Sequence, residues 1–202
     1  DVVEKFAREL SSGEQIVLRS KEGFQIANLN FEEFWKPDLQ KESKLVYGTN
    51  DPLHPAVDYL INRSNKVYLA GKIEKISIPS HYDFIQYRLS PDEAKRKFKE
   101  LGWDRIVAFQ TRNPLHRAHV EMTISSMEKL DARLFLHPVV GLTKTGDVDY
   151  FTRVRCYQHV LKKYPQNSVI LSLLPLAMRM GGPREALLHA IVRKNYGCTH
   201  II

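Results

Sequence analysis

The sequence predicts an α/β fold, a Rossmann-like parallel-sheet domain over residues 89–202 preceded by a smaller β-rich domain over residues 1–88. Two observations carry this prediction. After residue 100, short and continuously apolar runs alternate with helical stretches, as in parallel sheets whose two faces are both covered. Before residue 88, alternating segments are instead separated by turn residues, as in antiparallel hairpins.

In the first domain, residues 15–19 and 24–29 flank Ser-Lys-Glu-Gly at 20–23, which predicts a hairpin. Residues 66–76 alternate well enough for one or two further strands. Between these segments we expect a stiff connection around Pro52 and Pro55 and a short helix at 56–61. We expect this β-rich domain to be incomplete.

The second domain is predicted to open on a helix just after Arg88. Ser90 suits the N-cap, Pro91 the first helical position, and Glu93 completes a capping box. This helix is expected to end near Leu101.

The rest of the chain reads as alternating strands and helices. The expected order is strand 106–109, helix 114–130, strand 133–140, helix 151–164, strand 169–174, helix 184–196 and a strand from residue 199. Such an order predicts a parallel sheet with helices on both faces.

The most informative segment directly follows strand 106–109. Residues 110–119 read Gln-Thr-Arg-Asn-Pro-Leu-His-Arg-Ala-His, with no acidic residue among them. Asn113 suits a helix N-cap and Pro114 the first helical position, so we expect the helix to begin inside this motif. Ligands of open α/β sheets bind beyond the carboxyl ends of the strands, and free N–H groups at a helix start favour anions. The motif therefore predicts an anion site, and we expect its ligands to be nucleotide phosphates.

Individual side chains in this motif suit that chemistry. His116 and His119 are three residues apart, so we expect them on one helix face. Arg112 can hold a tetrahedral oxyanion through several N–H groups, and Gln110 adds an amide donor. The competing interpretations are a structural role for the histidines and a zinc site, although His-x-x-His without a following ligand set is a weak zinc pattern.

Charge is unevenly distributed along the chain. Residues 1–100 hold 16 basic and 16 acidic residues, whereas residues 101–202 hold 14 basic and 7 acidic residues, which gives the whole net charge of +7. The second half has only two adjacent basic pairs, at 162–163 and 193–194, so small anions are a better prediction than nucleic acid. No apolar run of about 18 residues predicts a membrane span.

Cysteine content and the chain start bear on the cellular compartment. Only Cys156 and Cys198 are present, which favours a reducing compartment over a disulfide framework. With no targeting segment visible, we expect a cytoplasmic location. The chain begins Asp-Val-Val-Glu without an initiator Met, so we expect a fragment of a longer protein.

Two other loops could contribute to the site. Thr143 and Lys144 follow the second strand of the predicted sheet, and Arg179 and Arg184 frame the glycine-containing loop after the third. In each case a solvated loop is an equally good interpretation. The histidines outside the motif are expected to be structural, and the dispersed Tyr and Phe residues are expected in the core.

The 110–119 motif closely resembles the nucleotide-binding motif of ATP sulfurylases (sulfate adenylyltransferases), which are nucleotidyltransferases. The resemblance continues through residues 137–144, 171–180 and 193–197, and residues 51–56 resemble the family's PUA-like N-terminal domain. It covers nearly the whole chain.

The resemblance implies transfer of the adenylyl group of MgATP to sulfate, giving adenosine 5′-phosphosulfate and pyrophosphate. It implies that Gln110 and Arg112 hold sulfate and that Gln110, Thr111, Arg112 and Asn113 contact ATP. Thr111, Arg112, Asn113, His116 and His119 are the implied catalytic residues, with Lys144 and Arg179 as secondary candidates. Magnesium is expected to arrive with ATP, no tightly bound metal is expected, and the full-length protein is expected to be a homo-oligomer that binds neither nucleic acid nor membrane.

One departure from the family is visible. Its second nucleotide motif, Gly-Arg-Asp-His-Ala-Gly, would follow the strand that begins at Thr199, and the sequence does not include it. We therefore expect the 202 residues alone to fold imperfectly or to lack normal activity. The alternatives are another nucleotidyltransferase with a His-x-x-His or His-x-Gly-His signature, an inactive fragment, or a nucleic-acid-binding module in the β-rich part.

Overall fold

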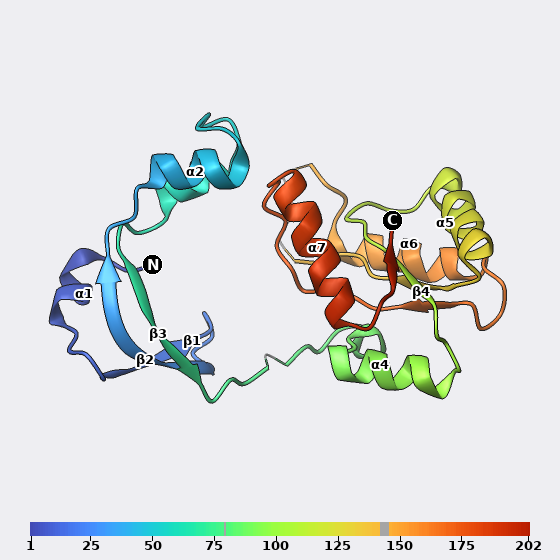
Figure 1. Cartoon of the computed structure of the whole chain (residues 1–202), viewed down its shortest axis with the longest axis horizontal. Coiled ribbons are helices and arrows are strands. Elements are labelled where there is room, and N and C mark those ends of the chain that lie inside the picture. Colours follow the sequence, from blue (N-terminus) through green and yellow to red (C-terminus); the bar gives the residue numbers. More distant parts are fainter. Residues whose placement is uncertain (79, 142–145) are drawn as a thin grey trace. The chain divides into compact units, whose positions relative to one another are not determined.

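A computed structural model describes residues 1–78, 80–141 and 146–202 of the chain. The chain forms two compact units, residues 1–81 and residues 82–202 (Figure 1). Each unit has its own sheet and its own buried residues.

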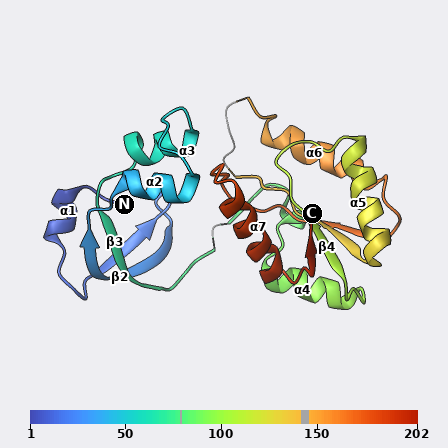
Figure 2. The ribbon, with the colours of Figure 1, turned by 45° about the horizontal axis from the view of Figure 1, so that its top comes forward.

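The first unit is built on a three-stranded antiparallel sheet in the order β1-β2-β3. Its strands are β1 (Gln15–Arg19), β2 (Gln25–Trp35) and β3 (Tyr68–Glu74). The predicted hairpin is confirmed, since β1 pairs with β2 and the Gly23 N–H donates to the Ser20 carbonyl in the turn between them. Figure 2 shows this sheet with the helices α1 (Glu4–Glu9), α2 (Leu39–Tyr47) and α3 (Pro55–Asp58), the last of which continues into a π-helical turn (Tyr59–Arg63).

The units divide between His81 and Tyr82, whereas sequence patterning placed the domain boundary near Arg88. The reason for this difference is that residues 82–88, with a 3-10 turn at Ile85–Tyr87, pack onto the second unit. Phe84 and Tyr87 lie against its core, and the Tyr87 carbonyl accepts from Leu173 N at 2.7 Å. Phe84 and Tyr87, which precede the helix α4 (Pro91–Glu100), thus belong to the second unit.

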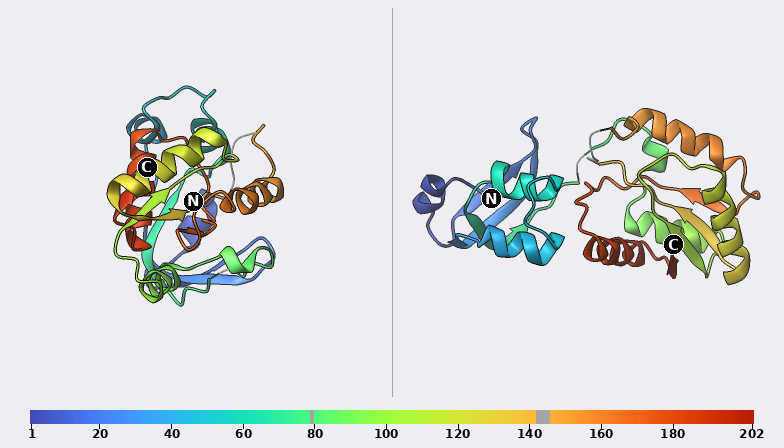
Figure 3. Two further views of the ribbon diagram at one scale, coloured as in Figure 1. Left: turned by 90° about the vertical axis from the view of Figure 1, so that its right-hand side faces the viewer. Right: turned by 90° about the horizontal axis from the view of Figure 1, so that it is seen from above.

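The second unit contains a four-stranded parallel sheet in the order β6-β5-β4-β7. The strands are β4 (Ile106–Phe109), β5 (Arg133–Leu136), β6 (Val169–Leu171) and β7 (His200–Ile201). The connecting helices are α4 (Pro91–Glu100), α5 (Arg117–Leu130), α6 (Tyr150–Leu161) and α7 (Pro183–Asn195), seen from further directions in Figure 3. The predicted parallel sheet with its intervening helices is confirmed.

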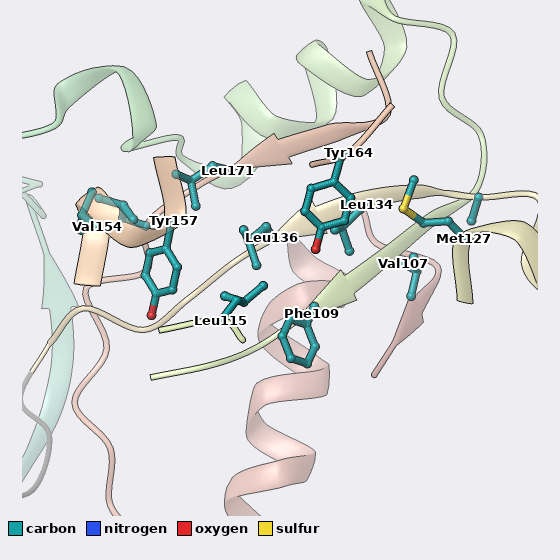
Figure 4. Packing of buried hydrophobic residues seen from close by; sticks show 12 residues of the cluster. Val107, Phe109, Leu115, Met127, Leu134, Leu136, Val154, Tyr157, Tyr164 and Leu171 are labelled. Atoms are coloured by element: carbon teal, nitrogen blue, oxygen red, sulfur yellow. The ribbon is translucent and has the colours of Figure 1, made fainter. Parts of the chain in front are cut away.

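The two faces of this sheet have separate cores. Figure 4 shows one of them, in which Leu134 and Leu136 of β5 point toward Met127 of α5 and Tyr157 of α6. The opposite face packs Phe135 against residues of α4 and α7. Because Leu134 and Leu136 are fully buried, truncating either one to Ala is expected to cost about 2–5 kcal/mol.

Local rules account for the start of α4. The Ser90 hydroxyl accepts from Glu93 N, and the Glu93 carboxylate accepts from Ser90 N at 2.7 Å. This is the capping box that the sequence predicted. Within the described part of the chain, the helices are all too short or too polar to cross a membrane.

Candidate active site

Three segments meet at the carboxyl edge of the parallel sheet, one after each of β4, β5 and β6. Main-chain hydrogen bonds join them beyond the ends of the strands: Val139 N donates to the Thr111 carbonyl at 2.9 Å, and Val140 N to the Leu174 carbonyl at 2.8 Å. A Cβ atom at Gly141 would lie 2.4 Å from the Leu176 carbonyl oxygen, so the segments approach as closely as glycine allows. The 110–119 motif is therefore anchored to a rigid edge.

The first half of the motif is a tight turn. The buried Thr111 hydroxyl donates to the Asn113 carbonyl at 3.0 Å and accepts from Asn113 N at 3.1 Å. The Tyr157 hydroxyl also donates to the Asn113 carbonyl, at 3.0 Å. Burial raises the pKa of Tyr157 to about 12, so this phenol stays a donor at neutral pH.

The predicted helix start is wrong. Helix α5 begins at Arg117 with His116 as N-cap, not at Pro114 with Asn113 as N-cap. The physical reason is that the Asn113 carbonyl, which at an N-cap would accept the first helical hydrogen bond, already accepts from the hydroxyls of Thr111 and Tyr157. The chain therefore completes a turn before it becomes helical.

His116 and His119 nevertheless lie together. Their ring centroids are 3.8 Å apart, and His116 N donates to Nδ1 of His119 at 3.4 Å. The pairing arises from the cap position of His116 rather than from a shared helix face. Burial, and second the neighbouring His116, lower the pKa of His119 below its ordinary 6.5.

Gln110 and Arg112 both meet the segment that follows β6. The amide of Gln110 lies 3.8 Å from the sulfur of Met178, and a terminal nitrogen of Arg112 lies 3.0 Å from the sulfur of Met180. Arg112 Nε is also 3.5 Å from Oδ2 of Asp147, whose side chain is only 6% exposed. Among the described residues, the guanidinium thus contacts one weak acceptor and one carboxylate.

Of the secondary candidate residues, two lie outside the described part of the chain and two lie within it. Lys144 and Thr143 lie outside the described residues. Arg179 lies on the 178–182 segment with an exposed side chain, and its main-chain N–H donates to Glu185 at 2.6 Å. Arg184 lies in the first turn of α7.

A family model described as ATP-sulfurylase matches residues 85–202, which contain this whole site. A second model, described as PUA-like domain, matches residues 1–78. The chain belongs to the ATP-sulfurylase family. The predicted resemblance is confirmed, as is the PUA-like domain ahead of the α/β domain.

Relatives of this chain carry the name sulfate adenylyltransferase. The protein from Schizosaccharomyces pombe is 50% identical over all of this chain, and that from Kluyveromyces lactis is 48% identical over all of it. The chain spans 42% and 40% of the lengths of these two relatives. Among solved structures, a hexameric APS kinase from Thiobacillus denitrificans matches 99% of this chain and 35% of its own at 31% identity, with a TM-score of 0.77.

A metal site would need several ligating side chains close together in the described part of the chain. No group of three or more His, Cys, Asp or Glu residues there is arranged to hold a metal ion. His116 and His119 therefore have no third metal-ligating side chain within the described part of the chain.

Sequence reasoning missed Arg153, which holds the turn of the motif. This arginine is 2% exposed, and one of its terminal nitrogens donates to the carbonyls of Arg112 at 2.8 Å and Val139 at 3.1 Å. A signal existed, since Arg153 interrupts the buried stripe that Val154 and Tyr157 form on α6. Asp147 and Glu185, the acidic residues that face the site, gave no comparable signal.

Proposed function

We propose that the whole protein is a sulfate adenylyltransferase, which transfers AMP from MgATP to sulfate and releases pyrophosphate. The observation that carries the proposal is the placement of Gln110, Arg112 and the His116–His119 pair on one turn at the carboxyl edge of the sheet, in a chain of this family. The names of its relatives support the choice of sulfate as acceptor.

In this proposal an oxygen of sulfate attacks the α-phosphorus of ATP, the bond from that phosphorus to the bridging oxygen breaks, and pyrophosphate leaves. Sulfate is already ionised, so no general base is required. The barrier must be lowered by positioning and by stabilising charge, as in phosphoryl transfer. This requirement fits a motif that has donors and no acidic residue.

Residues of the 110–119 motif are proposed to bind both substrates and to stabilise the developing charge. Gln110 and Arg112 hold sulfate through amide and guanidinium N–H groups, and Thr111, Arg112 and Asn113 with Gln110 contact ATP. His116 and His119 stabilise the charge that develops at the α-phosphate. Magnesium enters as part of the substrate MgATP, and Lys144 and Arg179 are secondary anion contacts.

We also propose that the whole protein is a cytoplasmic homo-oligomer that binds neither nucleic acid nor membrane. The neutral charge of residues 1–100 supports the absence of nucleic-acid binding. Light scattering of the full-length protein at several concentrations would test the oligomer, and a mass equal to one chain would contradict it.

The function is tested by sulfate-dependent exchange of pyrophosphate into ATP, measured on the full-length protein. Arg112→Ala and His116→Ala are expected to lower kcat/KM by about 100-fold or more, in line with loss of a preorganised charge-stabilising group. Arg117→Ala and His159→Ala are matched controls because both side chains are exposed, and they should stay near wild type.

Three results would change the assignment. Exchange that does not depend on sulfate would favour another nucleotidyltransferase. Exchange at the wild-type rate in both site variants would overturn the residue assignment. Full turnover by residues 1–202 alone would overturn the expectation that this part of the protein lacks normal activity.

A further inference from the structure

Helix α7 buries a row of ionisable side chains instead of an apolar stripe. Glu185, His189 and Arg193 are four residues apart, share one helix face and are 8%, 5% and 1% exposed. Leu187 and Ile191 of the same helix are exposed. Charged residues are seldom buried unless they are paired, so this reversal of the usual pattern needs a reason other than core packing.

The members of the row contact one another. Oε1 of Glu185 is 3.9 Å from Nε2 of His189, and Nδ1 of His189 is 2.6 Å from a terminal nitrogen of Arg193. The other terminal nitrogen of Arg193 donates to the His137 carbonyl at 2.7 Å, directly after β5. The row is thereby tied to the same sheet edge that carries the motif.

At the other end of the row, the Glu185 carboxylate holds the segment 178–182. Its two oxygens accept from Arg179 N at 2.6 Å and from Gly181 N at 3.0 Å. Between these two residues Met180 has a φ of 56°, a left-handed conformation that is uncommon for a side chain of this size. Such a conformation persists where surrounding contacts fix it, and the carboxylate supplies two of them.

Segment 178–182 contacts Gln110 and Arg112, the two side chains proposed to bind sulfate. Met178 lies against Gln110 and Met180 against Arg112, at the sulfur distances given above. A displacement of residues 178–182 would therefore reach both anion-binding side chains. Thioether sulfur is a weak acceptor, so it can orient an N–H group without competing strongly with an anion.

We propose that Glu185, His189 and Arg193 are positioning residues that hold segment 178–182 so that Met178 and Met180 orient Gln110 and Arg112 for sulfate. The inference rests on the proposed function and deepens it, because it names a specificity device behind the site. Each carboxylate oxygen of Glu185 takes a different main-chain N–H, so replacing one oxygen with an NH₂ group removes one of the two acceptors.

The first test reads the position of the segment without using activity. Methionine methyl groups of the full-length protein are labelled with ¹³C, and the signals are assigned with Met178→Leu and Met180→Leu. In Glu185→Gln an NH₂ group replaces one acceptor, so the Met178 and Met180 signals are expected to shift. The signals of Met122 and Met127 on α5 are expected to stay in place.

The second test measures steady-state kinetics of the same variants. Glu185→Gln is expected to raise the KM for sulfate about tenfold, because both side chains proposed to hold sulfate, Gln110 and Arg112, are displaced. The KM for ATP is expected to rise less, because ATP keeps Thr111 and Asn113 as further contacts. Arg193→Lys keeps the positive charge, but a single ammonium group cannot replace the two terminal nitrogens that contact His189 and the His137 carbonyl. This variant should raise the KM for sulfate by a smaller factor. Glu100→Gln, on the exposed surface of α4, is the matched control.

Each outcome decides the proposal. Shifted methionine signals together with a raised sulfate KM support it. Unshifted Met178 and Met180 signals overturn it, as does an unchanged sulfate KM when the signals have shifted. If Glu185→Gln does not fold, the same criteria apply to Arg193→Lys. If the wild-type protein shows no sulfate-dependent exchange, the proposed function is refuted. The methyl spectra do not depend on activity, so they still report whether Glu185 positions segment 178–182.

Discussion

The guanidinium of Arg153 donates a hydrogen bond to the main-chain oxygen of Arg112 at 2.8 Å, so a buried cation on α6 fixes the backbone of the residue proposed to bind sulfate. The same nitrogen reaches the Val139 carbonyl at 3.1 Å and so joins the segments after β4 and β5. The backbone of the turn is thus defined by a side chain 41 residues away in the sequence.

Replacing Arg153 with Met is expected to destabilise the protein and the turn together. Two carbonyls lose their donor, which costs about 2 kcal/mol of unfolding free energy, and kcat/KM is expected to fall about 100-fold. Urea unfolding at constant m-value and pyrophosphate exchange measure the two effects. Arg155→Met, on the exposed side of the same helix, is the control, and equal behaviour of the two variants would contradict the role of Arg153.

Asp147 is expected to weaken anion binding at Arg112. Its carboxylate oxygen lies 3.5 Å from Nε of Arg112, where it partly neutralises the guanidinium that the anion would use. In Asp147→Asn the Kd for sulfate should therefore fall about fivefold at low ionic strength, with a smaller change at high salt. Calorimetric titration measures it with Asp104→Asn as an exposed control, and weaker sulfate binding in Asp147→Asn would refute the prediction.

The His116–His119 pair gives a titration that proton NMR can follow. Burial is the main cause that lowers the pKa of His119, and the second cause is His116. In His116→Ala the pKa of His119 should therefore rise but remain below 6.5, because the burial persists. A pKa of His119 that does not move would show that the two imidazoles are not electrostatically coupled.

Where sequence reasoning succeeded, the deciding interactions were local. The capping box of Ser90 and Glu93 and the 20–23 turn each depend on neighbours within a few residues. The composition of the site was predictable for the same reason, because its polar residues lie in one continuous motif.

Where sequence reasoning failed, the deciding partner was distant along the chain. The start of α5 moved to Arg117 because the Tyr157 hydroxyl, 44 residues after Asn113, joins the Thr111 hydroxyl in donating to the Asn113 carbonyl. The row on α7 was likewise invisible, since a helical period of charged residues normally predicts an exposed face. Only the packed structure shows that these charges are buried and paired.

Stability in acid is expected to depend on His137. This imidazole is fully buried between the rings of Phe135 and Tyr196, at centroid distances of 4.5 and 4.4 Å. Burial, and then the charges of Arg193 and His189, hold the pKa of His137 well below 6.5. The unfolded chain therefore binds a proton below pH 6.5 that the folded chain does not, and the free energy of unfolding falls as the pH falls through this range, by up to about 1.4 kcal/mol per pH unit for this group.

His137→Phe removes the group while keeping a ring in the space, so its unfolding free energy should fall less steeply than that of wild type between pH 6.5 and 5. Any packing cost of the larger ring is the same at every pH and does not alter the slope. Chemical denaturation across this range measures the slopes, with the exposed His159→Phe as control, and parallel slopes for His137→Phe and wild type would show that His137 does not contribute to the acid sensitivity.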